Sequence, residues 1–433
     1  MSANNKNGSL RIFAATVLAA GVRFWLMHSK YQKIIANHIE VSTPLNSWKR
    51  VSEGLFLISK HISPYNGDLL HESPLLLYMY KQLLKIFWNN TGLMFITLDM
   101  LTGFVLYITT KKYLNTLYKK EERQKLSYAP DTTEYLLTFV DSVKAPNLVL
   151  LTFLFNPFTI LNCIGCSTAV IFYLFLSMFL CAMVHGKVTL SSVFLSICTS
   201  MSFYPITLII PLCLYFVNTF SSKLKAVSSV GLFLASLFSI HTFCYKYDPK
   251  YFMNVYGFIL SVPDLQPNIG LFWYFFTEMF DHFRELFIYS FQINATILYL
   301  IPLAIKFRQQ PFLLTYALLF LITVFKSYPC IGDVGFVISL LPSFMYLFRF
   351  CQQGFPASVV YIITTTLAPI LWHLWIYCNS ANANFYFGVT LAFAIAQIFL
   401  LTDVLFAQVK REYYLKNGKN ISINGQDGNL TLE

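Results

Sequence analysis

Apolar stretches of membrane-spanning length recur along the whole chain. The clearest lie at residues 10–26, 92–109, 168–184, 286–305, 311–325, 334–350, 358–377 and 385–406. A helix needs about 20 apolar residues to cross a bilayer, and less regular windows between residues 147 and 253 add further candidates. The pattern therefore predicts roughly 10–13 transmembrane helices. Because membrane-spanning segments must satisfy their own backbone hydrogen bonds, we expect an all-α polytopic membrane protein.

Composition supports this interpretation. Hydrophobic residues make up 56% of the 433 residues and charged residues only 12%, which is about half the charged fraction of a typical soluble domain. We therefore expect a single multispanning membrane domain over residues 1–433. No small-residue cleavage site follows the first apolar stretch, so we interpret it as a retained helix rather than a signal peptide.

The net charge of +11 is concentrated in two basic clusters, at residues 111–125 and 410–419. Basic segments beside membrane spans stay in the cytosol, which predicts a cytosolic basic loop at 111–145 and a cytosolic tail at 409–433. Residues 28–90 then form the first lumenal loop. The apolar piece within it is too short to span and is expected as an interfacial helix. Neither basic cluster belongs to a soluble surface, so we expect no nucleic-acid partner.

The first lumenal loop carries a polar segment at residues 46–76. Pro64 and Pro74 interrupt helices there, and Tyr65 and His71 lie close to the short apolar helix. A polar loop fixed by prolines beside a bilayer suits the headgroup or sugar of a lipid. The alternative is an elbow with a purely structural role.

A second polar segment places Glu278, Asp281, His282 and Glu285 at helical spacing, opposite aromatic residues. This pattern favours an amphipathic interfacial helix. Glu278 and His282 also have the spacing of a metal-binding pair, but no nearby residue supplies the other ligands. The sequence therefore predicts no metal site and no cofactor.

Catalytic signatures are missing from the sequence. It contains no nucleophile elbow, no phosphate-binding glycine loop and no HExxH. Cys163 and Cys166 form a CxxC without a second pair, and we interpret them as packing residues. We predict no catalytic residue in this chain.

The third polar segment interrupts the apolar C-terminal region. Carboxamide and hydroxyl side chains gather there beside aromatic residues, namely Trp372, His373, Trp375, Asn379, Ser380, Asn382 and Asn384. Polar groups within a membrane helix are costly and face the bundle interior or a wet cavity. Carboxamides both donate and accept hydrogen bonds, which suits sugars. The alternative is a helix cap, since Ser380, Asn382 and Asn384 are all good capping residues.

Five motifs are distinctive: SPYNGDLLHESPLL (63–76), GLFWYFFTEMFDHF (270–283), KSYPCIGD (326–333), LWHLWIY with SANANF (371–385) and KREYYL (410–415). Together they resemble the PIG-U family, whose members are the multispanning subunit of the glycosylphosphatidylinositol (GPI) transamidase of the endoplasmic reticulum. The motifs follow one another in order over most of the chain.

The resemblance extends to the GPI mannosyltransferases, which implies a C-type glycosyltransferase-like bundle with lumenal interfacial helices. Those enzymes carry an acidic D-x-D motif upstream of segments that are kept here as SEG (52–54) and SPY (63–65). In this chain the acidic motif falls on His38, Ile39 and Glu40, and a further aspartate falls on Asn46. Since a catalytic site of this kind needs more than one acid, the fold is expected to be kept and the chemistry lost.

The resemblance thus implies a non-catalytic subunit in the membrane of the endoplasmic reticulum. Its expected partners are the caspase-like catalytic subunit, the other transamidase subunits, the GPI lipid and the attachment signal of the precursor protein. The expected ligand-binding residues are Tyr65, His71, His373, Trp375, Ser380, Asn382 and Asn384. The alternatives are an active mannosyltransferase that uses dolichol-phosphate mannose, and a lipid scramblase or transporter.

Overall fold

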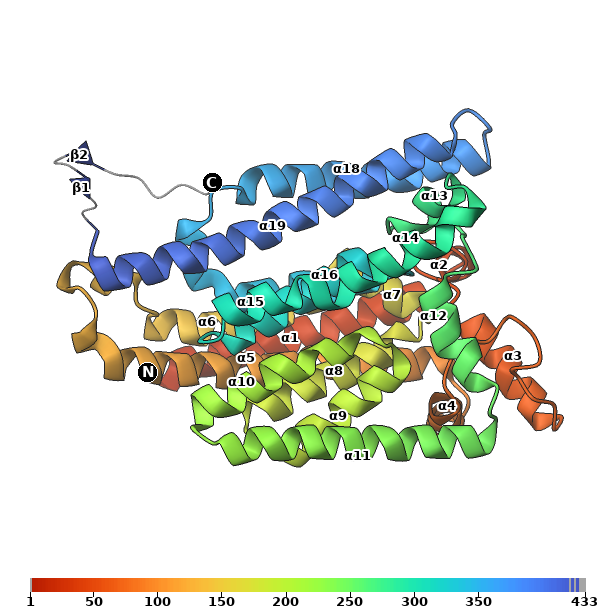
Figure 1. Cartoon of the computed structure of the whole chain (residues 1–433), viewed down its shortest axis with the longest axis horizontal. Coiled ribbons are helices and arrows are strands. Elements are labelled where there is room, and N and C mark those ends of the chain that lie inside the picture. Colours follow the sequence, from red (N-terminus) through yellow and green to blue (C-terminus); the bar gives the residue numbers. More distant parts are fainter. Residues whose placement is uncertain (1, 420–421, 424–425, 428–433) are drawn as a thin grey trace. The chain divides into compact units, whose positions relative to one another are not determined.

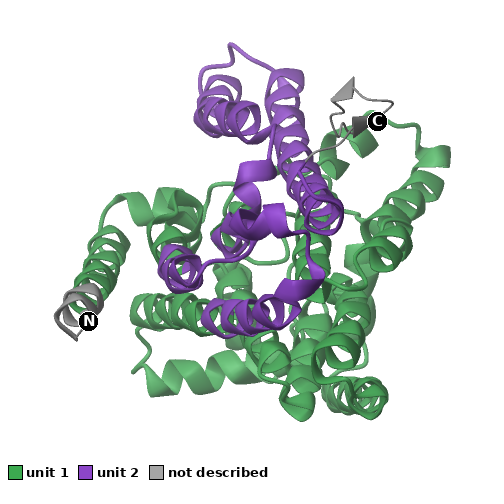
Figure 2. Ribbon diagram, turned by 90° about the vertical axis from the view of Figure 1, so that its left-hand side faces the viewer, with its two compact units in different colours: residues 1–109, 150–339 green, residues 110–149, 340–433 purple. Residues whose placement is uncertain are grey.

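The computed structural model describes residues 2–419, 422–423 and 426–427, with side chains described from residue 10 to residue 419. It divides into two compact units (Figure 2). Unit 1 is Met1–Thr109 with Leu150–Ser339, and unit 2 is Thr110–Val149 with Leu340–Glu433. Each unit is assembled from two separate stretches of the chain.

Unit 1 is helical (Figure 1). Its α-helices are α1 (Ser2–Met27), α2 (Tyr31–Ala36), α3 (Trp48–Ser59), α4 (Pro74–Ile86), α7 (Pro157–Ile164), α8 (Ala169–Val184), α9 (Val188–Met201), α10 (Ile209–Phe220), α11 (Lys223–Tyr247), α12 (Phe258–Ser261), α13 (Phe272–Thr277), α14 (Asp281–Ile293), α15 (Leu300–Lys306) and α16 (Pro311–Phe325). A 3-10 helix, η3 (Tyr204–Leu208), and two π-helices, η4 (Met253–Gly257) and η5 (Asn294–Leu298), complete it.

Three helices contribute residues to both units: α5 (Thr91–Gln124), α6 (Phe139–Phe155) and α17 (Ile331–Leu340). Unit 2 adds α18 (Gly354–Ile376), α19 (Ala383–Asn417) and the 3-10 helices η1 (Lys125–Ser127), η2 (Pro130–Tyr135) and η6 (Leu341–Phe350). The strands β1 (Ser422–Ile423) and β2 (Gln426–Asp427) form a short antiparallel pair.

In the described part of the chain, eight helical segments are long and apolar enough to cross a membrane: Leu10–Met27, Thr91–Ser127, Pro130–Phe155, Lys223–Tyr247, Asp281–Lys306, Ile331–Phe350, Gly354–Ile376 and Ala383–Asn417. Four shorter apolar segments are Ala169–Val184, Val188–Met201, Tyr204–Phe220 and Pro311–Phe325. The predicted class, an all-α polytopic membrane protein, is confirmed. The predicted count of 10–13 spans requires that some of the shorter helices also cross.

Prolines and capping residues set several helix starts. Pro157 begins α7, and the preceding Asn156 accepts a hydrogen bond from the Phe158 N–H at 3.0 Å. Pro311 begins α16 and Pro74 begins α4. Proline suits the first helical position because its missing N–H would be unpaired there anyway. The 13 residues of α4 rise about 20 Å, too short for a hydrocarbon core of about 30 Å.

The cytosolic placement of the two basic segments stays a prediction, and the structure gives their secondary structure. The segment at 111–145 is helical as far as Gln124, because α5 continues without a break. Lysine and glutamate are good helix formers, and no proline or glycine interrupts them there. The predicted tail at 409–433 likewise begins inside α19; its residues 420–421, 424–425 and 428–433 lie outside the described residues.

The predicted amphipathic helix through Glu278 and Glu285 is wrong. Helix α13 ends at Thr277 and α14 begins at Asp281. Because of this break, Glu278 and His282 do not share one helical face. Among the described residues, no group of three or more His, Cys, Asp or Glu side chains is placed to hold a metal ion.

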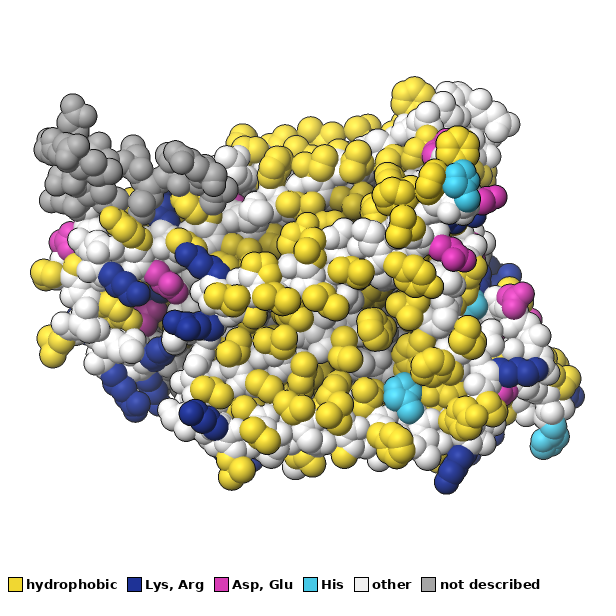
Figure 3. All heavy atoms as spheres, in the orientation of Figure 1, with side chains coloured by type: hydrophobic (Ala, Val, Ile, Leu, Met, Phe, Trp, Pro, Cys, Tyr) yellow, Lys and Arg dark blue, Asp and Glu magenta, His cyan; other side chains and the backbone are white. Residues whose placement is uncertain are grey.

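The surface and the interior of unit 1 differ from those of a soluble protein. Hydrophobic side chains cover the outer face of α11, where Leu224, Val227 and Phe238 are each more than two-thirds exposed (Figure 3). The interior, in contrast, holds charge: Arg23 Nε on α1 lies 2.7 Å from Asp99 Oδ2 on α5, and both side chains are buried. This arrangement is typical of a helix bundle that faces hydrocarbon.

Buried polar contacts also hold unit 2 together. The guanidinium of Arg411 on α19 lies 2.7 Å from the carboxylate of Glu121 on α5. The Asp403 carboxylate of α19 accepts hydrogen bonds from the backbone N–H groups of Gln352 and Gln353, at 2.8 and 2.9 Å. These N–H groups precede α18 and would otherwise lack a helical partner. Asp403 therefore fixes the start of α18 against α19.

Candidate functional site

Unit 1 contains a cavity of about 1010 Å³, which we call the His71 cavity. Its polar lining includes Asp68 and His71 from the first loop, His241 from α11, Asn254 from η4, and Asp264. Its apolar lining comes from Phe203, Ile206, Leu237, Phe252 and Leu260. The volume is at the upper limit of ordinary ligand pockets, about 300–1,000 Å³. The cavity is large enough for a polar headgroup together with part of a hydrocarbon chain.

His71 is held in one orientation at the cavity wall. Its Nδ1 lies 2.7 Å from the backbone carbonyl of Asn254, and its ring stacks on Phe258 with centroids 3.5 Å apart. Burial lowers the pKa of the imidazole, although the hydrogen bond to the Asn254 carbonyl partly offsets this effect. We therefore take His71 as neutral at physiological pH.

The polar loop in front of α4 is anchored from both sides. Tyr65 is buried, and its hydroxyl donates to the backbone carbonyl of Glu72 at 2.6 Å. Asn254 Nδ2 donates to the backbone carbonyl of Tyr65 at 3.3 Å, and Ser63 is hydrogen-bonded to Asp248. The structure thus places Tyr65 as an anchor of the loop and His71 as a wall of the cavity.

A second, smaller cavity of about 80 Å³ lies among buried polar groups of unit 1. Its lining includes Asn46, Glu72, Tyr204, Lys326 and Asp333. Lys326 Nζ lies 2.5 Å from Asp333 Oδ2. Burial alone lowers the pKa of Lys326, but the neighbouring Asp333 carboxylate outweighs it and raises the pKa above its ordinary value.

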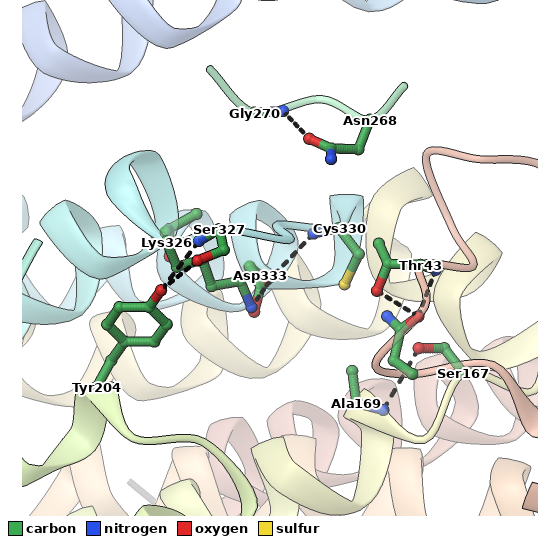
Figure 4. Close-up of polar contacts among 12 residues, drawn as sticks. Thr43, Ser167, Ala169, Tyr204, Asn268, Gly270, Lys326, Ser327, Cys330 and Asp333 are labelled. Carbon is green, nitrogen blue, oxygen red and sulfur yellow. Dashed lines mark hydrogen bonds and ion pairs between the residues drawn. The ribbon is translucent and has the colours of Figure 1, made fainter. Parts of the chain in front are cut away.

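The KSYPCIGD motif makes two groups of buried hydrogen bonds, one around this ion pair and one around Ser327 (Figure 4). The Asp333 carboxylate accepts from the Cys330 N–H and from the Tyr173 hydroxyl, each at 2.9 Å. The Tyr204 hydroxyl lies 2.8 Å from Ser327 Oγ and donates to Gln292 Oε1 at 2.9 Å. The motif therefore joins α8, η3 and α14 through buried polar contacts.

The predicted resemblance aligns Asn46 and His38 with acidic residues of the mannosyltransferases, and Asn46 makes structural contacts within its own loop. Asn46 Oδ1 accepts from the Thr43 N–H at 2.6 Å, while its Nδ2 donates to the Val41 carbonyl at 3.3 Å. An aspartate at this position has no N–H to donate. Burial lowers the pKa of His38, so this residue does not supply a positive charge at neutral pH.

The ionisation of Glu72 makes the free energy of unfolding of unit 1 depend on pH. The side chain is buried, and Thr168 Oγ1 donates to its carboxylate at 2.5 Å. Burial raises the pKa from 4.5 to about 7, although the hydrogen bond from Thr168 lowers it in part. The unfolded chain therefore ionises first as the pH rises. The free energy of unfolding should fall by on the order of 3 kcal/mol between about pH 4.5 and pH 7.

We expect Glu72→Gln to remove this fall, because glutamine does not ionise and can still accept from Thr168. Thermal unfolding of the tagged protein in detergent at pH 5 and pH 8 measures it. The variant should gain stability relative to the unchanged chain at pH 8, but not at pH 5. Glu53→Gln is the matched control, since Glu53 is exposed on α3. Parallel pH profiles for the Glu72 variant and the unchanged chain would contradict the assignment.

The turn between α18 and α19 in unit 2 carries the other predicted residues. Asn379, Ser380, Asn382, Asn384 and His373 are exposed there. Asn382 is the N-cap of α19, and its side chain accepts from the Phe385 N–H at 3.3 Å. The capping interpretation therefore holds for this one residue. Asn379 adopts a left-handed conformation with φ of 52°, which asparagine tolerates better than most residues.

Aromatic rings lie beside these polar groups. Trp372 is 5.4 Å from both Trp375 and the buried Tyr386, measured between ring centroids. His373 stacks on Tyr377 at 5.2 Å. Such rings are suited to the boundary between headgroups and hydrocarbon. The turn combines an aromatic platform with exposed carboxamides.

The structure thus separates the predicted ligand-binding residues into two groups. In unit 1, His71 lines the His71 cavity and Tyr65 anchors the adjacent loop. In unit 2, Ser380 and Asn382 lie in the turn, Asn384 lies at the start of α19, and His373 and Trp375 lie at the end of α18. Sequence reasoning missed the cavity's other polar residues, His241, Asn254 and Asp264. A signal was present for His241, an ionisable residue in the apolar α11.

Comparison with known proteins decides the family. The model of the family described as GPI transamidase subunit PIG-U matches residues 17–393. The chain belongs to the PIG-U family. A relative in Homo sapiens named GPI-anchor transamidase component PIGU is 39% identical over 428 residues, covering 95% of this chain and 96% of the relative.

Relatives in other organisms support the PIG-U family assignment. The Cricetulus griseus protein of the same name is 38% identical over 428 residues, covering 95% of this chain and 96% of the relative. The GPI transamidase component GAB1 of Saccharomyces cerevisiae is 30% identical over 385 residues, covering 88% of this chain and 90% of the relative. The predicted resemblance is confirmed.

Proposed function

We propose that this chain is a subunit of a GPI transamidase and holds the GPI lipid while the anchor is attached to a protein. The observation that carries the proposal is the match to PIG-U over residues 17–393, together with relatives that are named as components of this complex. The proposed location is the membrane of the endoplasmic reticulum. The proposed partners are the caspase-like catalytic subunit, the other subunits and the attachment signal of the precursor.

The role is proposed to be non-catalytic. Asn46 and His38 stand where a related mannosyltransferase would have acids, and Asn46 is engaged in holding its own loop. The names of the relatives do not favour a mannosyltransferase. A holding role needs no acid–base pair, only a surface that fits a glycan beside acyl chains.

The turn between α18 and α19 is the proposed contact for the GPI headgroup. Its exposed carboxamides offer both donors and acceptors to hydroxyl groups. The aromatic platform of Trp372, Trp375 and Tyr386 suits the face of a sugar ring or an acyl chain. The turn joins two helices of membrane-spanning length, which supports a proposed position where the headgroups meet the hydrocarbon.

The test separates binding from capping. Asn384→Leu removes a carboxamide without touching the cap that Asn382 provides. A lost hydrogen bond to ligand costs on the order of 1 kcal/mol, so the GPI that co-purifies per assembled complex should fall several-fold. Asn382→Asp keeps an N-cap but lacks the amide donor, and it should lower GPI occupancy without reducing assembly.

Asn417→Leu is the matched control, because it makes the same substitution on an exposed residue at the other end of α19. GPI occupancy should stay at the level of the unchanged chain in this control. If occupancy is also unchanged in both Asn384→Leu and Asn382→Asp, the turn does not hold the lipid.

A further inference from the structure

Helix α5 is longer than a bilayer requires. The first 20 of its 34 residues, at 91–110, carry one charged side chain, Asp99, which is paired with Arg23. These residues rise about 30 Å, which matches the hydrocarbon core of a bilayer. Residues 111–124 continue the same helix without a break (Figure 1) and rise about 20 Å further. A crossing by the apolar part leaves these residues in water, and we call them the α5 extension.

One face of the α5 extension is basic. At about 100° per residue, Lys112, Lys119 and Arg123 lie within about 40° of one another around the helix axis, and Lys120 flanks them. All four side chains are exposed, and none of them forms an ion pair with another described residue. The exposed carboxylate of Glu122 points roughly 80° away from the centre of this row. We call the four cationic residues the basic face.

The opposite side of the α5 extension is held by the rest of unit 2. The buried carboxylate of Glu121 lies 2.7 Å from the guanidinium of Arg411 and accepts the Leu137 N–H at 2.8 Å. The Ala129 N–H donates to the Leu415 carbonyl at 2.9 Å. A segment that only sets membrane topology needs no fixed geometry, since that signal depends on the number of Lys and Arg residues. The fixed geometry favours binding, because preorganised side chains lose less entropy on association.

Lipid headgroups reach only part of the basic face. The headgroup layer is roughly 6 Å thick on each side of the hydrocarbon core. At about 1.5 Å per residue, Lys112 lies about 3 Å beyond the end of the apolar part, Lys119 about 13 Å and Arg123 about 20 Å. Arg123 is therefore more than one Debye length, about 8 Å, beyond the headgroups. The outer half of the basic face suits an anion in water.

Nucleic acid fits the basic face less well than protein does. Proteins that bind single strands combine cations with aromatic rings on which the bases stack. The two aromatic residues of the α5 extension do not offer such a ring, because Tyr113 is buried and Tyr118 packs on Phe139 with ring centroids 6.1 Å apart. An acidic protein segment needs only carboxylates. Four cations spread over about 17 Å of helix match a short segment of this kind.

We propose that the basic face of the α5 extension binds an acidic segment of a partner protein. Carboxylates of that segment pair with the three lysines, and Arg123 offers two parallel N–H donors to one carboxylate. Exposed ion pairs are individually weak, so the affinity depends on several of them together and falls as the salt concentration rises. This role is additional to the proposed holding of GPI and does not depend on it.

The test uses the assembled complex in phosphatidylcholine nanodiscs, with a fluorescent peptide of ten glutamates as the probe. Fluorescence anisotropy measures the affinity. Lys119→Gln with Arg123→Gln should lower it about tenfold, since each exposed ion pair contributes up to about fivefold. The matched control, Lys125→Gln with Lys416→Gln, removes two exposed charges of unit 2 outside the basic face and should change the affinity less than twofold. Equal losses in the two double variants would overturn the proposal.

Other anions give distinct results. A ten-nucleotide uridine oligomer, similar in charge to the peptide, should bind no more tightly than the peptide does; tighter binding would contradict the assignment to protein. The anionic lipid that co-purifies with the complex should be the same for the unchanged chain and for Lys119→Gln with Arg123→Gln. A fall in that lipid would show that headgroups occupy the basic face, and the proposal would then fail.

The partner itself can be sought in isolated membranes. A carbodiimide joins lysine side chains to carboxylates that touch them. Mass spectrometry of the crosslinked peptides should connect Lys112, Lys119 or Lys120 to a segment of another protein that contains several Asp or Glu residues. If these lysines are crosslinked only within their own chain, or not at all, no acidic partner occupies the basic face and the proposal is wrong.

Discussion

Replacement of Asp99 with leucine is expected to destabilise the protein strongly and to lower its melting temperature. The change leaves the Arg23 guanidinium buried without its carboxylate, which was 2.7 Å away. Breaking a buried ion pair in this way costs about 3–5 kcal/mol, a large part of a typical stability of about 5–15 kcal/mol. The hydrogen bond from Arg23 Nη1 to the Leu154 carbonyl, at 2.7 Å, is put at risk as well.

Fluorescence-detected gel filtration of the tagged protein, after heating in detergent, measures this loss. The double variant Arg23→Leu with Asp99→Leu removes both charges and should recover much of the stability, since a buried pair is often replaceable by apolar residues. Asp281→Leu, on an exposed carboxylate of α14, should change little. Equal melting temperatures for the Asp99 variant and the unchanged chain would refute the prediction.

The second large effect is expected for Asp333→Ala. This substitution removes the partner of Lys326 and the acceptor for both Tyr173 and the Cys330 N–H. We expect a loss of about 3–5 kcal/mol near pH 6, where the buried ammonium stays charged and unpaired. Without the carboxylate, burial dominates and the pKa of Lys326 falls below that of the unfolded chain.

A specific pH dependence follows for this variant. Native Lys326 then loses its proton before the unfolded chain does, so the stability of Asp333→Ala should rise with pH towards about pH 10. Thermal unfolding at pH 6 and pH 9 measures it. The double variant Lys326→Met with Asp333→Ala should be more stable than the single variant at pH 6 and should lack the pH dependence. A pH-independent loss in the single variant would show that the ammonium is not its cause.

The membrane class of the fold was predictable from the sequence, because apolar windows of spanning length are a local signal. Helix ends were less predictable where the residue composition favours one secondary structure and the chain adopts another. The basic stretch after Thr109 looked like a loop, yet its lysines and glutamates favour continuing the helix. The break between Thr277 and Asp281 interrupts a pattern that has perfect helical spacing.

The candidate sites show the same limit. His71 was found from its polar loop, but its partner Asn254 is 183 residues away in the chain, and no periodicity connects the two. Arg23 and Asp99 are single charges within apolar windows, which is a signal for a buried partner but does not say which one. For Asn382, the residue type fitted both a cap and a ligand contact, and only the backbone geometry identifies the cap.

The segments of the two units alternate along the chain, and this order matters while the ribosome synthesises the protein. Unit 2 is made of residues 110–149 and 340–433, so its first part emerges from the ribosome before the second part of unit 1 has been made. Glu121 and its partner Arg411 are 290 residues apart. At about 5–20 residues per second, Glu121 waits roughly 15–60 s for that partner. During this interval its carboxylate must remain hydrated or be held by a chaperone, which makes unit 2 the part of the chain that matures last.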